Sequence, residues 1–328
     1  MVALAIEAGD DTPAARRDAG AEFVIVRLAR TARIGRLCRC ASGERDDECD
    51  GDEAQLGHGI SGDGRQEPVA LYMKIATFNI NNINRRLPNL LAWMRLAKPD
   101  VVALQELKAS DGEFPAAAIE KAGYGAVWCG QKTWNGVAIL ARDAEPILTR
   151  DRLPGRPDDL EARYIEAAVR GIIVTSIYLP NGNPQPGPKF DYKLDWFARL
   201  KRHAKTFIKQ DLPVVLAGDY NVAPDEIDIY PTRSWDKDAL IQPKSRAAFA
   251  SLVDQGWRDA IRELHPGERI YTFWDYKRNR WPRDAGLRLD HLLLSPALAP
   301  LLAKAGVDRK IRGEDGASDH APAWVVLR

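Results

Sequence analysis

The sequence PVVLAGDYNVAP, residues 213–224, is an apolar segment that ends in polar side chains. Residues 214–217 are continuously apolar, as in a strand that is covered on both faces of its sheet. After Gly218, Asp219 and Asn221 are spaced by two, so in extended backbone both side chains point the same way. A carboxylate and an amide are costly to bury at a strand end. The segment therefore predicts either an ordinary turn or a functional site.

The composition is typical of a globular protein. The chain has 328 residues, of which 45% are hydrophobic and 28% charged, enough for a large core in one or two domains. No apolar run approaches the ~18 residues that a transmembrane helix needs, so we do not expect the chain to span a bilayer.

Charge is distributed unevenly along the chain. Residues 1–72 hold nine arginines and 14 acidic residues, a net of −5, which leaves 38 basic and 32 acidic residues, a net of +6, in the remainder. Residues 41–67 are rich in Gly, Asp and Glu, which suits disorder. We expect residues 1–72 to be a disordered extension and Met73 to be the functional start. The mildly basic remainder is compatible with a polyanionic partner.

Cysteine usage points to a reducing compartment. Only Cys129 follows Met73, so this part of the chain cannot form an internal disulfide. Cys38 and Cys40 have no second pair at a spacing suited to zinc. We expect a cytoplasmic protein.

Hydrophobic periodicity predicts more strands than helices. Strands are expected at 74–80, 101–104, 124–129, 136–140, 165–169, 172–179, 214–217, 270–273, 287–294 and 323–327. Helices are expected between Pro88 and Pro99 and at 115–122, 190–208, 246–255 and 298–305. Hairpins and strand–helix–strand units both occur. This favours an α/β fold with a mixed sheet, or two packed sheets with helices outside.

Six of the apolar segments end in, or contain, an acid, an amide or a polar aromatic. These residues are Asn79 and Asn81, Glu106, Tyr178 with Asn181, Asp219 with Asn221, Asp290, and Asp319 with His320. Each has a structural explanation when taken alone; Glu106, for example, could simply pair with Lys108. Because strand ends of a sheet collect in one place and ligands bind there, all six together predict one functional site.

The residue types select the chemistry. Oxygen ligands dominate and histidine is scarce, which favours a hard cation such as Mg²⁺ over Zn²⁺. The sequence has neither a His-Glu-x-x-His motif nor a Gly-x-x-x-x-Gly-Lys-[Ser/Thr] phosphate loop. A magnesium ion held by acids and amides suits the hydrolysis of phosphate esters.

From Met73 to the C-terminus, the chain resembles the bacterial exonuclease III family of abasic-site endonucleases, within the endonuclease/exonuclease/phosphatase superfamily. The resemblance rests on the motifs FNIN, LQELK, GQKTWNGVAIL, YLPNG, LAGDYNVAP, TFWDY, LRLDHLLLS and SDHAP. It implies a four-layered α/β/β/α sandwich, with two mixed β-sheets packed face to face and helices outside. Residues 73–328 would then be a single catalytic domain.

The activity implied by the resemblance is Mg²⁺-dependent DNA repair, with Mn²⁺ as a possible substitute. Its reactions would be incision 5′ of abasic sites, 3′–5′ exonuclease action on double-stranded DNA, and cleaning of 3′ ends. The expected partner is double-stranded DNA, bound by a monomer associated with the nucleoid.

The resemblance also implies residue roles. Glu106 resembles the principal metal ligand, with Asn79 beside it and Asp319 as a further acid near the metal. Asp219 and Asn221 are additional candidates for the metal site. One or two metals are both compatible with this set.

For catalysis, Asp219 resembles the aspartate that activates water or protonates the leaving oxygen, with Asn221 as its partner. His320, oriented by Asp290, resembles the histidine that contacts the phosphate. The family leaves the identity of the base open. Since an ordinary Asp is ionised at neutral pH and His titrates near ~6.5, we favour Asp219 as base and His320 as electrostatic stabiliser.

DNA contact requires cations and an aromatic face. In the basic loop WDYKRNRWPRDAGLR, residues 274–288, Trp281 resembles the aromatic of the abasic pocket, and Trp274 is expected to be structural. Further candidates for phosphate or DNA contact, besides Tyr178, are Asn81, Asn181, Gln131, Lys132, Asn135, Arg163 and Arg283.

Two other functions compete with a DNA nuclease. One is a superfamily phosphatase or phosphodiesterase that acts on a non-DNA phosphate ester, against which the basic loop argues. The other is an inactive nucleic-acid-binding scaffold, against which the complete set of acids, amides and histidine argues.

Overall fold

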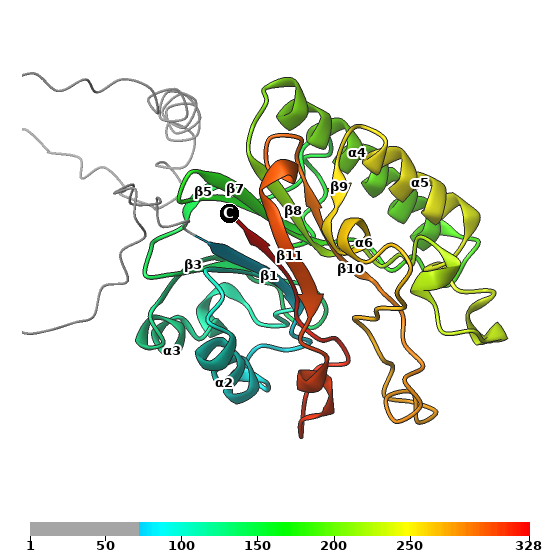
Figure 1. Cartoon of the computed structure of the whole chain (residues 1–328), viewed down its shortest axis with the longest axis horizontal. Coiled ribbons are helices and arrows are strands. Elements are labelled where there is room, and N and C mark those ends of the chain that lie inside the picture. Colours follow the sequence, from blue (N-terminus) through cyan, green and yellow to red (C-terminus); the bar gives the residue numbers. More distant parts are fainter. Residues whose placement is uncertain (1–71) are drawn as a thin grey trace, which may run out of the picture.

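The computed structural model describes residues 72–328, which form two β-sheets packed face to face with helices on both outer sides (Figure 1). The α/β/β/α arrangement expected from the sequence is confirmed. The expectation of a disordered extension falls on residues that, but for Tyr72, lie outside the described part. None of the helices in residues 72–328 is both long and apolar enough to cross a membrane.

Each sheet has six strands, and parallel and antiparallel pairs follow one another in the same order in both sheets. The first contains, from edge to edge, β11 (Leu302–Val307), β12 (Ala323–Leu327), β1 (Met73–Asn79), β2 (Val101–Gln105), β4 (Val137–Arg142) and β3 (Tyr124–Cys129). The second contains β9 (Arg258–Asp259), β10 (Asp290–Leu294), β8 (Val214–Asp219), β7 (Ile172–Tyr178), β6 (Tyr164–Val169) and β5 (Ile147–Arg150). In each sheet the central pair, β1–β2 or β7–β8, is parallel and the other pairs are antiparallel.

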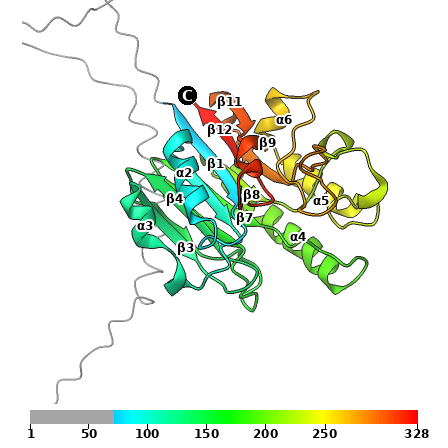
Figure 2. The same cartoon turned by 90° about the horizontal axis from the view of Figure 1, so that it is seen from below.

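Three apolar layers hold the sandwich together. Between the sheets, Ile75 and Val101 of the first sheet share a buried cluster with Val174 and Leu292 of the second. Separate clusters join each sheet to its outer helices. The helices lie on opposite outer sides (Figure 2): α2 (Leu87–Ala97) and α3 (Ala116–Lys121) on the first sheet, α4 (Pro188–Lys209) and α5 (Pro243–Val253) on the second. The remaining helical elements are α6 (Ala260–Leu264) and the 3₁₀ turns η2 (Asp111–Glu113), η3 (Glu226–Asp228), η4 (Arg233–Trp235), η5 (Ala299–Leu301) and η6 (Arg309–Gly313).

Gly218 lies inside β8, in register with Ile177 of β7. A Cβ atom at this position would stand 2.1 Å from the carbonyl oxygen of Ile177. Glycine is therefore required here for the close approach of two backbones, and the turn begins only after Asp219.

Two sequence-based expectations are wrong in detail. The helix expected at 298–305 is instead the short η5 followed by the edge strand β11, because pairing with β12 takes over from Leu302 onwards. The strand expected at 270–273 is reduced to isolated bridges, which join Phe273 to Leu287 and His320. The strands β5 and β9 and the helix α6 were not anticipated.

Candidate active site

The sheet topology brings the polar strand ends to one edge of the sandwich. In the first sheet, Asn79 at the end of β1 lies in register with the last residue of β2, which Glu106 follows. In the second, Asp219 at the end of β8 lies in register with Tyr178 on one side and Asp290 on the other. The carboxyl ends of both parallel pairs thus meet at one site, as expected for a sheet-based ligand site.

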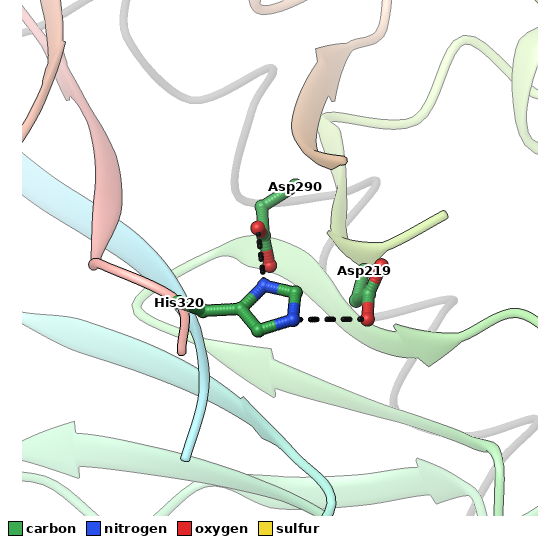
Figure 3. Close-up of side chains that lie close together, drawn as sticks. All are labelled: Asp219, Asp290 and His320. Carbon is green, nitrogen blue, oxygen red and sulfur yellow. Dashed lines mark hydrogen bonds and ion pairs between the residues drawn. The ribbon is translucent and has the colours of Figure 1, made fainter. Parts of the chain in front are cut away.

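His320 lies between two aspartates at the centre of this site (Figure 3). Its Nδ1 lies 2.8 Å from Oδ2 of Asp290, and its Nε2 lies 3.9 Å from Oδ2 of Asp219. All three residues are almost fully buried. The second acceptor oxygen of Asp290 has no hydrogen-bond partner among the described residues, although it is buried.

Glu106 and Asp219, which come from different sheets, are joined through one amide. The Nδ2 of Asn79 donates to Oε1 of Glu106 at 2.9 Å and to Oδ2 of Asp219 at 3.0 Å. The hydroxyl of Tyr178 donates to Oε1 of Glu106 at 2.8 Å. The ammonium of Lys108 lies 2.8 Å from Oε2, so the pairing that the sequence offered as a structural explanation for Glu106 is also present.

The backbone at this site adopts unusual conformations. Glu106, Lys108 and Asn221 have φ angles of 53°, 51° and 47°, in the left-handed region that side chains rarely adopt. Such conformations cost about 1–3 kcal/mol each and persist only where the surroundings hold them. Their concentration at the strand ends is typical of a functional site.

The surroundings of Glu106 lower its pKa, whereas those of Tyr178 raise its pKa. Burial acts to raise the pKa of Glu106, but the charge of Lys108 and hydrogen bonds from Asn79 and Lys108 outweigh it, so the pKa lies below its usual value. Burial raises the pKa of Tyr178 well above its usual value, and the charge of Glu106 adds to this. Tyr178 is therefore a neutral donor and Glu106 an anion.

Asp219 and His320 shift in the directions that a base and a cation require. Burial holds the pKa of Asp219 above its usual range, against the opposing charge of His320. Burial acts to lower the pKa of His320, but the adjacent Asp290 carboxylate more than reverses this and raises it. A buried imidazolium beside a carboxylate of raised basicity favours proton transfer to Asp219 and charge stabilisation by His320.

The donor set fits a hard divalent cation. The carboxylate oxygens of Asp219 and Asp290 lie within 4.8 Å of one another and of a ring nitrogen of His320. Because the protonated ring of His320 has no free lone pair for a metal, the two aspartates are the donors of this group. The carboxylates of Glu106 and Asp219, bridged by Asn79, offer oxygen donors beside that cluster. Carboxylate and amide oxygens are the ligands that such cations prefer, and the unpartnered oxygen of Asp290 is a further donor.

The amides predicted from the sequence surround this centre. Asn181 donates from Nδ2 to Oδ1 of Asn221 at 3.2 Å, and the backbone N–H of Asn221 donates to Oδ1 of Asp219 at 2.9 Å. On the other side, Nδ2 of Asn81 donates to Oδ1 of Asp319 at 2.9 Å. The structure therefore brings all the strand-end residues of the prediction into one connected group.

An open cavity of about 780 Å³ adjoins this group at Tyr178 and Asn181. Gln131, Asn135 and Arg163 line it as well, so three of the secondary DNA-contact candidates lie beside the catalytic cluster. Lys132 is largely exposed, with its ammonium 3.3 Å from a carboxylate oxygen of Glu113.

The predicted roles of Trp281 and Arg283 in DNA contact stay predictions, and the structure gives the packing of both side chains. Trp281 packs edge-to-face on Trp274 at 5.1 Å between ring centroids and beneath the guanidinium of Arg309. Arg283 lies over the ring of Tyr230.

The aromatic ring beside His320 is that of Phe273, with its centroid 4.9 Å away, and sequence reasoning missed it. The run TFWDY contains three aromatic residues, and the path of the loop decides which of their rings faces the site.

A hard-cation site with a buried imidazolium, at the strand ends of an α/β/β/α sandwich, defines a metal-dependent phosphoesterase. The chain belongs to the endonuclease/exonuclease/phosphatase family, whose model matches residues 76–320. The resemblance seen in the sequence motifs is confirmed.

The relatives of the chain are DNA-repair enzymes. It is 32% identical over 268 residues to exodeoxyribonuclease III of Haemophilus influenzae, which covers 78% of this chain and all of that protein. The structure of an AP endonuclease from Archaeoglobus fulgidus is similar at a TM-score of 0.74 and 35% identity, covering 78% of this chain and 99% of the other. A variant of the 3′ phosphatase NExo from Neisseria, bound to a product DNA hairpin, is similar at 0.75 and 39%, with the same coverage.

Proposed function

We propose that this protein is a Mg²⁺-dependent DNA-repair nuclease that incises 5′ of abasic sites, trims 3′ ends exonucleolytically and removes blocking groups from them. The observation that carries the proposal is the chain of contacts from Asp290 through His320 to Asp219, joined by Asn79 to Glu106. This chain of contacts holds the residues that we assign to the base, to the stabilisation of charge on the phosphate and to the metal site. The relatives, which are named for exonuclease, AP endonuclease and 3′-phosphatase activities, support the substrate class.

In this mechanism, Asp219 accepts the proton of the attacking water and the water oxygen forms a bond to phosphorus. The bond from phosphorus to the 3′ oxygen breaks, and this oxygen takes a proton from solvent water to become the new 3′ hydroxyl. The imidazolium of His320 and the amide of Asn181 stabilise the charge that develops on the phosphate oxygens. Asp290 keeps His320 protonated and oriented through the 2.8 Å contact.

Glu106, Asn79 and Asp219 would hold the metal ion, with Asp319 nearby. When bound, the ion supplies positive charge beside the phosphate. A positioned base accelerates a reaction only ~10²–10⁴-fold, whereas enzymes typically reach ~10⁶–10¹⁷-fold, so charge stabilisation must supply the remainder. The ammonium of Lys108 on Glu106 partly neutralises this carboxylate and keeps it in place.

Phe273, whose ring is tilted by 55° relative to that of His320, provides an apolar surface where the sugar next to the scissile phosphate would lie. An abasic sugar lacks a base and is easily extruded from the helix, so an apolar wall beside the imidazolium selects for it.

We further place the activity in residues 73–328, acting as a monomer on double-stranded DNA in the cytoplasm. A chain that begins at Met73 should fold and nick DNA at the rate of the full chain. Failure of this shorter chain to yield folded, active protein would overturn the domain assignment.

The test uses the full chain with duplex DNA that carries one abasic site and, separately, with a 3′-phosphate duplex. Mg²⁺ should support turnover on both and EDTA should abolish it. Asp219→Asn should still bind the duplex but lose turnover by at least about 10²-fold. Wild-type protein that binds DNA without cutting it, or cuts only non-DNA phosphate esters, would overturn the proposal.

A further inference from the structure

One buried cation near the site takes no part in the chemistry described above. Lys193 lies on α4 with no exposed surface, on the same face as the buried Phe190, Phe197 and Leu200. An ammonium in such a position costs several kcal/mol unless its donors are satisfied. Its contacts must therefore compensate this cost.

The donors of Lys193 are directed at three main-chain carbonyls. Its Nζ lies 2.5 Å from the oxygen of Asn221, 3.0 Å from that of Asn181 and 3.4 Å from that of Ala239. Burial lowers the pKa of Lys193 to about 7. In its protonated form the amino group has three donors, and this set uses all of them. The carbonyls belong to three separate segments: the loop after β7, the loop after β8 and the irregular segment before α5.

Two of these carbonyls belong to residues whose side chains line the site. Asn181 donates to Asn221, and Asn221 donates from its own amide to the carbonyl oxygen of Leu179 at 2.9 Å. The ammonium thus closes a ring in which main chain and side chains of both loops are fixed. Asn221 needs this support, because its φ of 47° lies in the strained left-handed region.

The chain also makes room for the lysine stem. Gly182 follows Asn181 directly, and a Cβ atom there would stand 2.7 Å from Cδ of Lys193. The absence of a side chain at Gly182 therefore leaves room for the stem of Lys193 next to Asn181.

We propose that Lys193 is a positioning residue for phosphodiester hydrolysis: it clamps the loops after β7 and β8, so that Asn181 and Asn221 stay aligned on the phosphate. This inference rests on the proposed nuclease function. Because the lysine is buried and does not reach DNA, it acts on the rate of the chemical step and leaves the affinity for the duplex unchanged.

Lys193→Met keeps the stem and removes the three donors. On the abasic duplex, we expect kcat to fall by about 10–100-fold with KM changed by less than about threefold, as for the loss of an interaction felt in the transition state. His203→Gln is the matched control, since His203 is also buried on α4 but contacts Glu166 instead of the site. It should lower thermal stability and leave kcat within about twofold.

A double-mutant cycle separates positioning from mere stability. If Lys193 acts through the asparagines, Lys193→Met should lower kcat by a much smaller factor in an Asn181→Ala background than in the wild type. His203→Gln should show equal factors in both backgrounds. If Lys193→Met does not fold, Lys193→Gln, whose amide retains two donors, replaces it in the cycle.

The outcomes are distinguishable. Two results would overturn the role of Lys193 while wild-type turnover still upholds the nuclease. One is an unchanged kcat in Lys193→Met, and the other is an equal loss of kcat on Lys193→Met with and without Asn181→Ala. Absence of wild-type turnover on DNA would overturn both proposals.

Discussion

The substitution Asp290→Asn tests whether the negative charge of Asp290 keeps His320 protonated. The substitution preserves the size of the side chain but replaces the carboxylate that lies 2.8 Å from Nδ1 of His320. Hydrogen bonds to charged groups contribute about 1.5–3 kcal/mol. Burial acts to lower the pKa of His320, and Asp290 opposes it most strongly, with further contributions from the charges of Asp219 and Asp319, so removal of the Asp290 charge should lower this pKa.

The size of the effect follows from the titration. Without the carboxylate, the pKa of His320 should fall towards its ordinary value of ~6.5, and at a pH one unit above that value only about a tenth of the molecules carry the imidazolium. If only the cationic form supports turnover, kcat falls by up to about tenfold at pH ~7.5. The loss should shrink as the pH is lowered towards ~6.5, whereas the wild type gains nothing from acidification.

The stability effect has a definite sign. The pKa of His320 is raised in the folded state, so its contribution is complete below the unfolded value of ~6.5 and is lost as the pH rises through the folded value. Asp290→Asn should therefore destabilise the protein most at mildly acidic pH. Thermal unfolding across this range would show it.

The assay is single-turnover nicking of the abasic duplex between about pH 6 and about pH 9, with saturating Mg²⁺. Glu166→Gln is the control, because Glu166 faces His203 at 2.9 Å in a buried pair outside the site. It should cost stability without changing the pH profile of nicking. A pH profile of Asp290→Asn that runs parallel to the wild type would refute the assignment of His320 as a cation held by Asp290.

Other substitutions test the remaining parts of the structure. Gly218→Ala should destabilise the fold by about 3 kcal/mol or more in denaturant unfolding, because its Cβ would collide with the carbonyl of Ile177, whereas Gly267→Ala, with open space around it, should be within about 0.5 kcal/mol of wild type. Glu106→Gln should raise the Mg²⁺ concentration required for half-maximal nicking by at least about tenfold, and a wild-type Mg²⁺ dependence would exclude it as a ligand. Phe273→Ala should lower kcat/KM on the abasic duplex by about tenfold; an unchanged value would show that the ring does not face the sugar.

Much of the site was predictable because its residues stand at strand ends. Glu106 follows an apolar strand, Asp219 ends one and Asp290 begins one, and a sheet gathers such ends without further information. Phe273 was not predictable, because three aromatic residues share its loop and only the path of the loop selects one. The role of Trp281 at the abasic pocket, which the sequence predicts, stays a prediction; its ring packs on Trp274.

The helix–strand error at 298–305 has a related cause. Leucine and alanine favour a helix there, but the segment gains more by pairing with β12 at the sheet edge, where Ala305 joins the core between the sheets. Lys193, by contrast, left a readable signal. It is a charged residue on the apolar face of a long helix, between Phe190 and Phe197, and such a position implies a buried partner.

The alignment of the two sheets decides whether the site exists, since Glu106 and Asp219 come from different sheets. A buried polar bridge lies directly behind them. Gln105 donates from Nε2 to Oγ of Ser176 at 2.9 Å, and Ser176 donates to the carbonyl oxygen of Leu104 at 2.7 Å. Apolar layers tolerate sliding, but hydrogen bonds in a dry interior do not, because each displaced donor would be left unpaired. The bridge therefore fixes the position of one sheet relative to the other at the point where Asn79 must reach both carboxylates. The metal site thus depends on the alignment of the two sheets.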